Sequence, residues 1–483
     1  MKNKLAVFTV FGFLFWANRH SSVFSLGLGE TLTALLLLAI TVAPTILWLI
    51  RGMRGLPILE LFCLAHFVYY AYPILATKPE YMDFSEGIRV QAGLAVCAFL
   101  ICSYVGYFLL RSLKAKPPGR FVSRQIEINR IRVIFWVLLF LWISTTIVVT
   151  FGLMPFAGRL LNILRTISAS SGIISIFFLF YLQGQRKFSL GETATLNTTF
   201  AIGIIVSFAS GFLVGGSTYM AMALIGFAFG KKRIPFFGAV LCMSLVSFLH
   251  LGKGEMRLRY WEGGMHGDYL QLSQIYPIYR DWVSYSWRNA VSPSPQRERT
   301  SVIDRLKLIH MLALVMNDTP SKLPYLKGET YAHIPKLAVP RMLWPEKPRG
   351  HISTETLGLY YNVQTEESVL YTSVGFGLIA EAWANFGWLG AMAVGLLFGI
   401  LTGIPARLSL QLPVNSIGFL ASILIVSWTF QLEHALSSYL ISLAQSLMVV
   451  LVGLFFISSR PPRTQSQPIR PVRRMAPQPR PAS

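Results

Sequence analysis

The chain has little charge for its length. Asp, Glu, Lys and Arg make up 13% of its 483 residues, whereas 53% of the residues are hydrophobic. So few charged side chains cannot cover a soluble surface, which excludes the two or three soluble domains that the length would allow. Residues 31–50 and 131–152 are apolar runs of about 20 residues, enough to cross a hydrocarbon core roughly 30 Å thick.

The apolar runs predict an all-α polytopic membrane protein with about twelve transmembrane helices, because a helix satisfies its own backbone hydrogen bonds in lipid. The first run begins after Lys2 and Lys4 and is followed by no small-residue cleavage site, which favours a retained helix over a signal peptide. The predicted spans lie near residues 4–17, 31–50, 56–76, 88–110, 131–152, 165–183, 196–214, 217–230, 234–251, 387–405, 415–430 and 436–457.

Cysteines and phosphate-binding motifs are also scarce. Cys63, Cys97, Cys102 and Cys242 all lie within predicted spans, at spacings that do not suit a metal ion, which favours small buried apolar side chains. The sequence has no Gly-rich phosphate loop and no Asp-x-Asp metal motif. We therefore expect neither a metal ion nor another cofactor.

Acidic residues are half as frequent as basic ones, and the excess of Lys and Arg alternates along the connections between spans. Because cytoplasmic connections retain Lys and Arg, both termini are predicted to be cytoplasmic and the long segment 252–370 to lie outside. A nucleic-acid partner is not expected, because anionic lipid head groups suffice for charges scattered beside a membrane. The counts are 43 Lys and Arg against 21 Asp and Glu, a net charge of +22.

The chain divides into four parts. Residues 1–251 are predicted to form an N-terminal bundle of about nine helices, 252–370 an extracytoplasmic segment, and 371–459 the C-terminal helices. Residues 460–483 are rich in Pro and Arg and lack apolar residues to bury, so this cytoplasmic tail is predicted to be disordered.

The outer segment contains a predicted amphipathic helix and a Pro-rich stretch. Residues 301–317 have the helical spacing of apolar side chains, with Arg305 near the start. Four prolines between residues 335 and 348 stiffen the backbone around Arg341 and Lys347. The stretch is either a surface turn with solvated charges or a rigid cradle for an anionic group.

Two polar groups lie at the start of the last apolar region. Glu381 is an ionisable residue in an otherwise apolar stretch, which makes it a functional candidate or the structural partner of a buried arginine. In a helix, Asn385 would share its face. His434, beside Glu433 in the last outer connection, is a second base, a group that orients the acceptor, or a structural hydrogen-bonding group.

Three segments of the sequence resemble the O-antigen polymerases and related oligosaccharide repeat-unit polymerases of bacterial envelopes. They are G-E-T-Y (328–331), P-R-M-L-W-P-E-K-P (340–348) and G-F-G-L-I-A-E-A-W-A-N-F-G-W-L-G (375–390), on a chain of many helices with one large outer loop. The resemblance implies a protein of the bacterial inner membrane that transfers a growing glycan from one polyprenyl diphosphate carrier to the sugar of another. It also implies membrane lipids and a chain-length regulator as partners.

The resemblance carries roles to individual residues. Arg341 and Lys347 match the family's Pro-Arg and Lys-Pro positions and would bind the diphosphate, with Arg305 as a third candidate. Glu381 would be the general base that deprotonates the acceptor hydroxyl, and Asn385 would orient it.

One family feature is missing. Where the family often has a Gly-Ser-Arg-Gly-like turn, this chain has Gly-Ser-Thr-Tyr at 216–219, without the arginine. Arg257 and Arg259 are the candidates to replace it. Two competing functions remain open: an O-antigen ligase, which uses the same donor, and a lipid-linked glycan flippase or transporter, which would be expected to carry charge at mid-membrane.

Overall fold

The computed structural model describes residues 26–75, 79–112, 118–153, 158–211, 213–262, 270–291, 308–339, 343–344, 346–370 and 372–459. Within these ranges the chain is helical and forms no strand, only isolated bridges from Gln125 to Ser416 and Ser459. Nine helices in the described part of the chain are long and apolar enough to cross a membrane. The predicted fold class, an all-α multi-pass membrane protein, is therefore confirmed at this level.

The nine helices match nine of the predicted spans. They are α2 (Leu28–Ile50), the continuous helix of α3 (Ile58–His66), η2 (Phe67–Ala71) and α4 (Tyr72–Leu75), then α6 (Glu86–Ser112), α7 (Ile128–Thr150), α8 (Gly158–Gly184), α10 (Leu213–Lys231), α11 (Phe236–Arg257), α17 (Leu378–Gln411) and α19 (Leu436–Ile457).

The other three predicted spans have different outcomes. The span at 196–214 corresponds to α9 (Leu190–Ala209), whose N-terminal half is too polar for α9 to be one of the nine. The span at 415–430 corresponds to α18 (Ile417–Trp428), which has 12 residues and is too short to cross a hydrocarbon core unaided. The span at 4–17 lies outside the described residues. The total of about twelve therefore stays a prediction.

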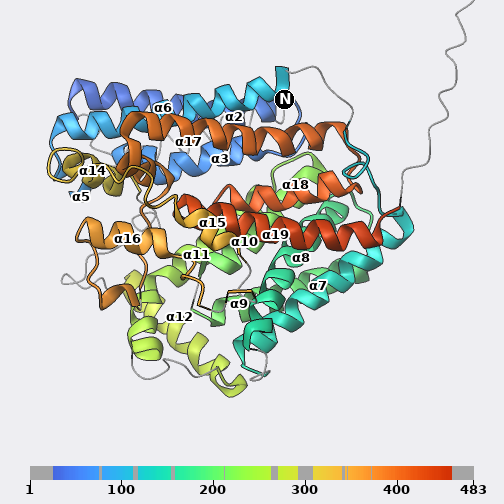
Figure 1. Ribbon diagram of the computed structural model, residues 1–483. Coiled ribbons are helices and arrows are strands. Elements are labelled where there is room, and N and C mark those ends of the chain that lie inside the picture. The colour runs from blue at the N-terminus through green and yellow to red at the C-terminus, as the bar shows by residue number, and fades with distance from the viewer. Residues whose placement is uncertain are drawn as a thin grey trace, which may run out of the picture.

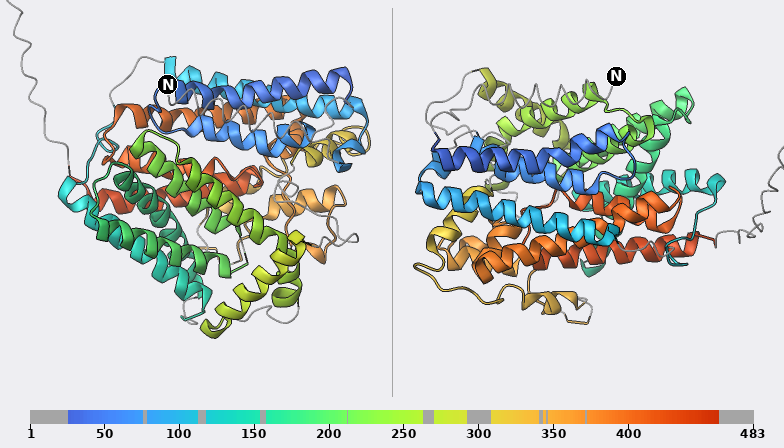
Figure 2. Two further views of the ribbon diagram at one scale, coloured as in Figure 1. Left: turned by 180° about the vertical axis from the view of Figure 1, so that it is seen from behind. Right: turned by 90° about the horizontal axis from the view of Figure 1, so that it is seen from above.

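The long helices lie roughly along a common direction, with their connections gathered at two ends (Figure 1). One group contains α2, α3, α6 and α17, and a second contains α7 to α11, with α18 and α19 between them in the views of Figures 1 and 2. The shorter helices of the outer segment, α12 (Ile275–Val291), α14 (Ile309–Asp318) and α16 (Ile352–Tyr360), lie at one end of the molecule.

The contact between α6 and α17 is the most extensive between any two helices. Gly395 and Gly399 of α17 lie one turn apart against α6, where a Cβ on Gly399 would be 2.1 Å from the carbonyl oxygen of Ser103. The hydroxyl of Ser103 donates to the Gly395 carbonyl at 2.9 Å. Small residues that let two backbones approach are the usual means of holding helices together in lipid. The two glycines therefore allow α17, from the C-terminal part of the chain, to pack among the helices α2, α3 and α6.

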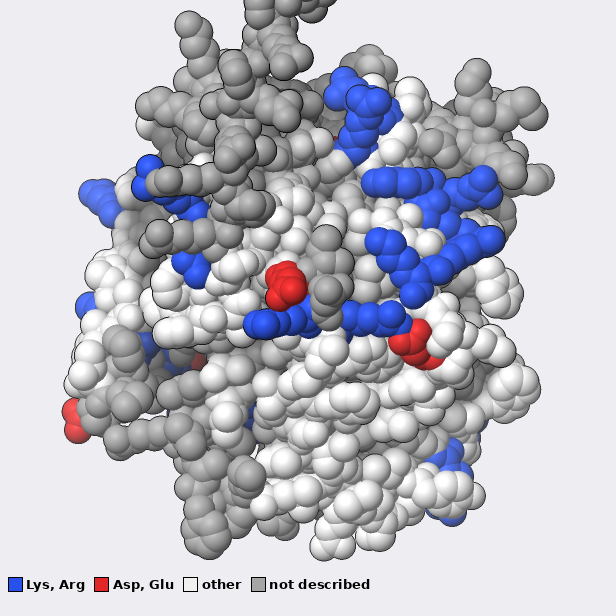
Figure 3. Space-filling view, turned by 90° about the vertical axis from the view of Figure 1, so that its right-hand side faces the viewer, with Lys and Arg blue, Asp and Glu red and all other residues white. Residues whose placement is uncertain are grey.

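The basic connections meet at the end opposite the outer segment. Lys232 Nζ donates to the carbonyl of Met53 at 3.0 Å, and Arg124 donates to the hydroxyl of Ser458 at 3.0 Å. Figure 3 shows this end, with many Lys and Arg side chains and few acidic ones on its surface. Connections that the charge pattern places on one side therefore lie together in the structure.

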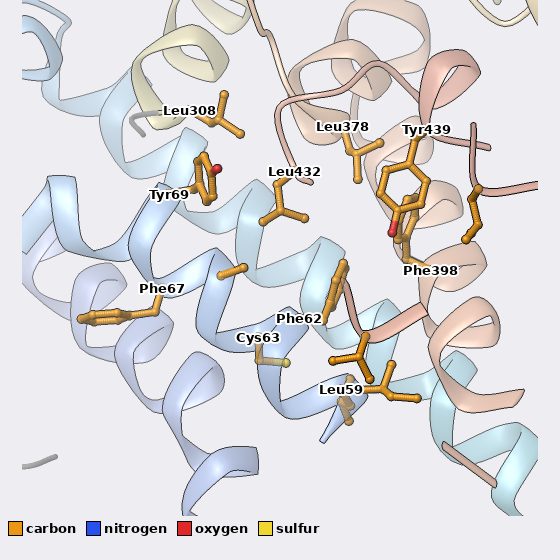
Figure 4. Packing of buried hydrophobic residues seen from close by; sticks show 14 of the residues in the cluster. Leu59, Phe62, Cys63, Phe67, Tyr69, Leu308, Leu378, Phe398, Leu432 and Tyr439 are labelled. Carbon is orange, nitrogen blue, oxygen red and sulfur yellow. The ribbon is translucent and has the colours of Figure 1, made fainter. Parts of the chain in front are cut away.

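Towards the other end, the core is a column of aromatic and aliphatic side chains (Figure 4). The ring of Phe62 on α3 stacks on Phe398 of α17 at 5.6 Å, and Phe398 packs edge-on against Tyr439 of α19 at 5.0 Å. Leu308, Leu378 and Leu432 belong to the same core and lie above the Phe62 ring in Figure 4. This column fixes the starts of α17 and α19 relative to each other.

A π-helical turn, η2, interrupts the helix that begins with α3. Its wider spacing leaves the Tyr69 carbonyl to accept a hydrogen bond from the N–H of Leu308 at 3.1 Å. Leu308 precedes α14, which overlaps the predicted helix 301–317 and ends one residue beyond it, and the apolar side chains of α14 are buried against α6 and α17. Residues 301–307 lie outside the described part. The outer segment is thus packed onto the spanning helices.

Candidate active site at the N-terminal end of α17

A break at Gly387 divides α17 into a short N-terminal helix and a long span. Gly387 has φ 60° and ψ −136°, which only glycine adopts readily, and a Cβ here would lie 2.8 Å from the Tyr325 hydroxyl. The short helix, residues 378–386, carries both predicted polar groups, Glu381 and Asn385, and the long part starts where the span 387–405 was predicted.

Glu381 is completely buried, and its two oxygens have different surroundings. Oε2 accepts a hydrogen bond from the backbone N–H of Leu436, the first residue of α19. The carboxylate therefore satisfies one of the N–H groups that a helix leaves unpaired at its N-terminus, where negative charge is also favoured. Oε1 makes no hydrogen bond of normal geometry with the described residues, although the Thr330 hydroxyl interacts with the carboxyl group.

Asn385 joins the G-E-T-Y segment to α17. Its Oδ1 accepts from the N–H of Gly328 at 2.9 Å, and its Nδ2 donates to the Thr330 hydroxyl and to the Glu381 carbonyl, each at 2.8 Å. The side chain is fully buried. Two of the three segments that carry the family resemblance are therefore in direct contact, and Asn385 tethers residues 328–330 to α17.

A chain of buried hydroxyls extends the site to α16 and α19. The Ser353 hydroxyl donates to the Thr330 carbonyl at 2.9 Å and shares a 2.7 Å hydrogen bond with the hydroxyl of Ser437. The next residue, Ser438, donates to the Gly350 carbonyl at 2.5 Å. Sequence reasoning did not identify these serines, because isolated serines in these segments have no distinctive spacing.

Tyr331, the last residue of G-E-T-Y, has a buried hydroxyl with no hydrogen-bond partner among the described residues. Burial, together with the negative charge of nearby Glu381, raises the pKa of Tyr331 well above its usual range, so the hydroxyl keeps its proton. Buried polar groups are rarely left unpaired in folded proteins. Here a donor, the Tyr331 hydroxyl, and an acceptor, Glu381 Oε1, lie in the same region, and neither makes a hydrogen bond of normal geometry with the described residues.

His434 lies in the turn between α18 and α19, two residues before Leu436, whose backbone N–H donates to Glu381. Its ring is 6.4 Å from that of His351 and nearly parallel to it, and 6.2 Å from the ring of Trp428. Burial and the neighbouring His351 lower the pKa of His434 to about 4. The imidazole is therefore neutral at pH 7.

Comparison with known proteins adds no family assignment. No family model matches the chain, and no curated protein or solved structure matches it.

Two of the five predicted diphosphate-binding cations, Lys347 and Arg259, have described side chains. Arg341 and Arg305 lie outside the described residues, and the side chain of Arg257, the last residue of α11, lies outside them as well. Arg259 is at the surface, where it contacts the Asp281 carboxylate of α12 at 3.3 Å and donates to the Tyr285 hydroxyl at 2.6 Å.

Lys347 is held by backbone carbonyls. Its Nζ donates to the carbonyls of Leu337 and Val339, the latter at 2.8 Å. Both carbonyls lie at the end of the short helix α15 (His333–Ala338), where a positive charge is favoured. The side chain therefore fixes the backbone immediately before the segment that contains Arg341.

A further cation, Lys253 on α11, lies near the site. Its charge acts on the carboxylate of Glu433, which also accepts a hydrogen bond from the Tyr69 hydroxyl at 3.2 Å. Glu433 follows α18 and directly precedes His434. Sequence reasoning did not single out Lys253 or Tyr69, because neither has a motif that indicates this contact.

Proposed function

We propose that the protein is a membrane glycosyltransferase that polymerises polyprenyl-diphosphate-linked oligosaccharide repeat units into a surface polysaccharide, an O-antigen or exopolysaccharide. The observation that supports this most is a pair of buried oxygens, Glu381 Oε1 and the Tyr331 hydroxyl, that make no hydrogen bond of normal geometry with the described residues. One belongs to each of two segments that resemble the polymerase family, and Asn385 ties those segments together.

The pair suits an acceptor hydroxyl. A sugar hydroxyl between the two residues would donate to Glu381 Oε1 and accept from Tyr331. As the sugar oxygen forms a bond to the anomeric carbon of the donor, its proton passes to Glu381. The bond from that carbon to the carrier diphosphate breaks, and its electron pair leaves with the diphosphate.

The leaving diphosphate develops negative charge, which fixed cations stabilise. In this proposal Arg341 provides the main bidentate contact with the phosphate oxygens, and Arg305 a second one. Lys347 positions the backbone before Arg341, consistent with its bonds to Leu337 and Val339. Lys253, at the outer end of α11, is an additional cation for this role.

The proposed orientation follows from charge. The end that collects the basic connections would face the cytoplasm, with both termini there, and the Glu381 region would face outward from the bacterial inner membrane. Lipid-linked repeat units would then be joined on the outer face, where a chain-length regulator can bind the growing polymer.

The test uses the full-length protein in lipid nanodiscs with a defined polyprenyl-diphosphate-linked repeat unit. Glu381→Gln and Arg341→Ala should each abolish polymer while leaving the protein folded and in the membrane. Matched controls are Glu127→Gln and Arg130→Ala, because these two residues form an exposed ion pair on the basic end. Full polymer yield in both site variants would rule out the proposed site.

A deletion strain separates polymerisation from ligation. Loss of a polymerase leaves single repeat units on the final acceptor, whereas loss of a ligase leaves long chains on the carrier lipid. Loss of a flippase would instead leave repeat units on the cytoplasmic face. The proposal requires that the deletion strain carries single repeat units on the final acceptor.

A further inference from the structure

A second site lies at the basic end, remote from Glu381. A cavity of about 980 Å³ opens between α2, α3, α6 and α17. The aromatic residues Trp48, Tyr104 and Phe108 line it together with aliphatic side chains. Phe108 is 53% exposed, and Leu47 and Leu410, at the edges of the cavity, are 48% and 49% exposed. These exposed apolar surfaces show that the cavity opens sideways, towards lipid.

The mouth of the cavity is a fixed turn that carries two arginines, Arg51 and Arg54. Trp48 Nε1 donates to the carbonyls of Arg54 and Gly55, each at 3.2 Å, and Met53 takes a left-handed conformation with φ 57°. From outside the turn, Lys232 donates to the Met53 carbonyl. These bonds hold the backbone of both arginines in place.

Neither arginine has an acidic partner in the part of the chain that the structure describes, and both are exposed. The acidic residue of the cavity wall, Glu60, lies deeper, beside Tyr104 and Cys63. Two unneutralised guanidinium groups at the rim of an apolar groove are complementary to a ligand with an anionic head and an apolar tail.

We propose that this groove binds a phospholipid with an anionic head group from the adjoining leaflet. The phosphate would lie between Arg51 and Arg54, and an acyl chain would pass along Trp48, Tyr104 and Phe108. A soluble phosphate would use only the two arginines and leave the apolar walls exposed. The proposed ligand is therefore a lipid, and the site is independent of the glycan chemistry at the other end of the protein.

Native mass spectrometry of the detergent-purified protein tests the site, with phosphatidylglycerol and phosphatidylcholine of matched acyl chains as probes. We expect one phosphatidylglycerol to bind most tightly and the Arg51→Gln, Arg54→Gln double variant to bind it roughly thirtyfold more weakly. Inorganic phosphate in millimolar excess should not displace it. The matched control is Arg120→Gln with Arg186→Gln, two exposed arginines outside the groove, which should bind normally.

Two further measurements separate groove binding from general surface attraction. Ala43→Trp fills the groove from its exposed, lipid-facing wall and keeps both arginines, and it should also weaken binding. Phosphatidylglycerol with brominated acyl chains should quench the fluorescence of Trp48, measured as the difference between the parent protein and Trp48→Phe. Equal binding by the double arginine variant and its control, or displacement by phosphate, would overturn the proposal.

Discussion

Glu381 accepts a hydrogen bond from the backbone N–H of Leu436, so the carboxylate that best suits a general base also completes the N-terminus of α19. The two roles use different oxygens, because Oε2 receives the N–H and Oε1 makes no normal hydrogen bond with the described residues. Substitutions of Glu381 can therefore separate its contribution to stability from its proposed role as a general base.

Glu381→Gln and Glu381→Leu should behave differently. The amide oxygen of Gln can still accept the N–H of Leu436, so the melting temperature should change little while polymer is lost. Leu leaves that N–H buried without an acceptor, which should cost about 1–3 kcal/mol of unfolding free energy. Thermal melting in one detergent and polymer assays in nanodiscs measure the two effects. If Glu381→Gln lowers the melting temperature as much as Glu381→Leu does, the hydrogen bond from the Leu436 N–H does not explain why Glu381 is buried.

Tyr331→Phe should lower activity without lowering stability. The Tyr331 hydroxyl is buried without a partner, so its removal should leave the unfolding free energy unchanged or raise it slightly. In the proposed reaction the hydroxyl orients the acceptor, and its loss should raise the KM for acceptor more than tenfold, about 1.4 kcal/mol. A matched control is Tyr360→Phe, whose exposed hydroxyl bonds the Pro324 carbonyl. Unchanged kinetics in Tyr331→Phe would remove the hydroxyl from the mechanism.

Asn385→Ala should release the G-E-T-Y segment from α17. Two hydrogen bonds between the segment and α17, to Gly328 and Thr330, are lost together with the bond inside α17 to the Glu381 carbonyl. At about 1 kcal/mol for each of the two bonds that hold the segment, it should open roughly thirtyfold more often. Amide hydrogen exchange should show faster exchange at residues 326–331 and little change in α6. Equal acceleration throughout the protein would mean that Asn385 stabilises the fold globally.

Much of this organisation is predictable from the sequence for a physical reason. A helix needs about 20 apolar residues to cross the lipid, so the apolar runs can be recognised in the sequence without knowing how the helices pack. The break at Gly387, which has a left-handed φ of 60°, falls where the span was expected to begin, after the polar residues Glu381 and Asn385. The predicted span 415–430 is four residues longer than the 12-residue α18, because hydropathy does not show at which residue a helix begins or ends.

The contacts of the site were less predictable. The hydrogen bond between Ser353 and Ser437 joins residues 84 positions apart, and neither residue differs in type or spacing from serines elsewhere in the chain. The sequence identified Asn385 as a polar neighbour of Glu381 on a common helical face. It could not show that its amide binds Gly328, because that contact depends on how the outer segment folds back onto α17.

The close approach of α6 and α17 predicts a strong effect of a small substitution. Gly399→Val would place a Cβ 2.1 Å from the Ser103 carbonyl oxygen, so the helices must separate. We expect a loss of about 1–3 kcal/mol or more in unfolding free energy. Gly453→Val in α19 is the control, because a Cβ there meets no atom within 4 Å. Thermal melting of both variants should show destabilisation only in the first.

His434 should make the outer end sensitive to acid. Its pKa is lowered from 6.5 to about 4 by burial and by His351, so the folded protein holds fewer protons than the unfolded chain between these pH values. The stabilisation from neutral His434 is therefore complete above pH 6.5 and is lost as the pH falls towards 4. His434→Gln, which cannot be protonated, should flatten the melting temperature over this range, whereas the control His351→Gln removes the second cause of the shift and should only reduce the slope. An unchanged slope in His434→Gln would place the acid sensitivity in other groups.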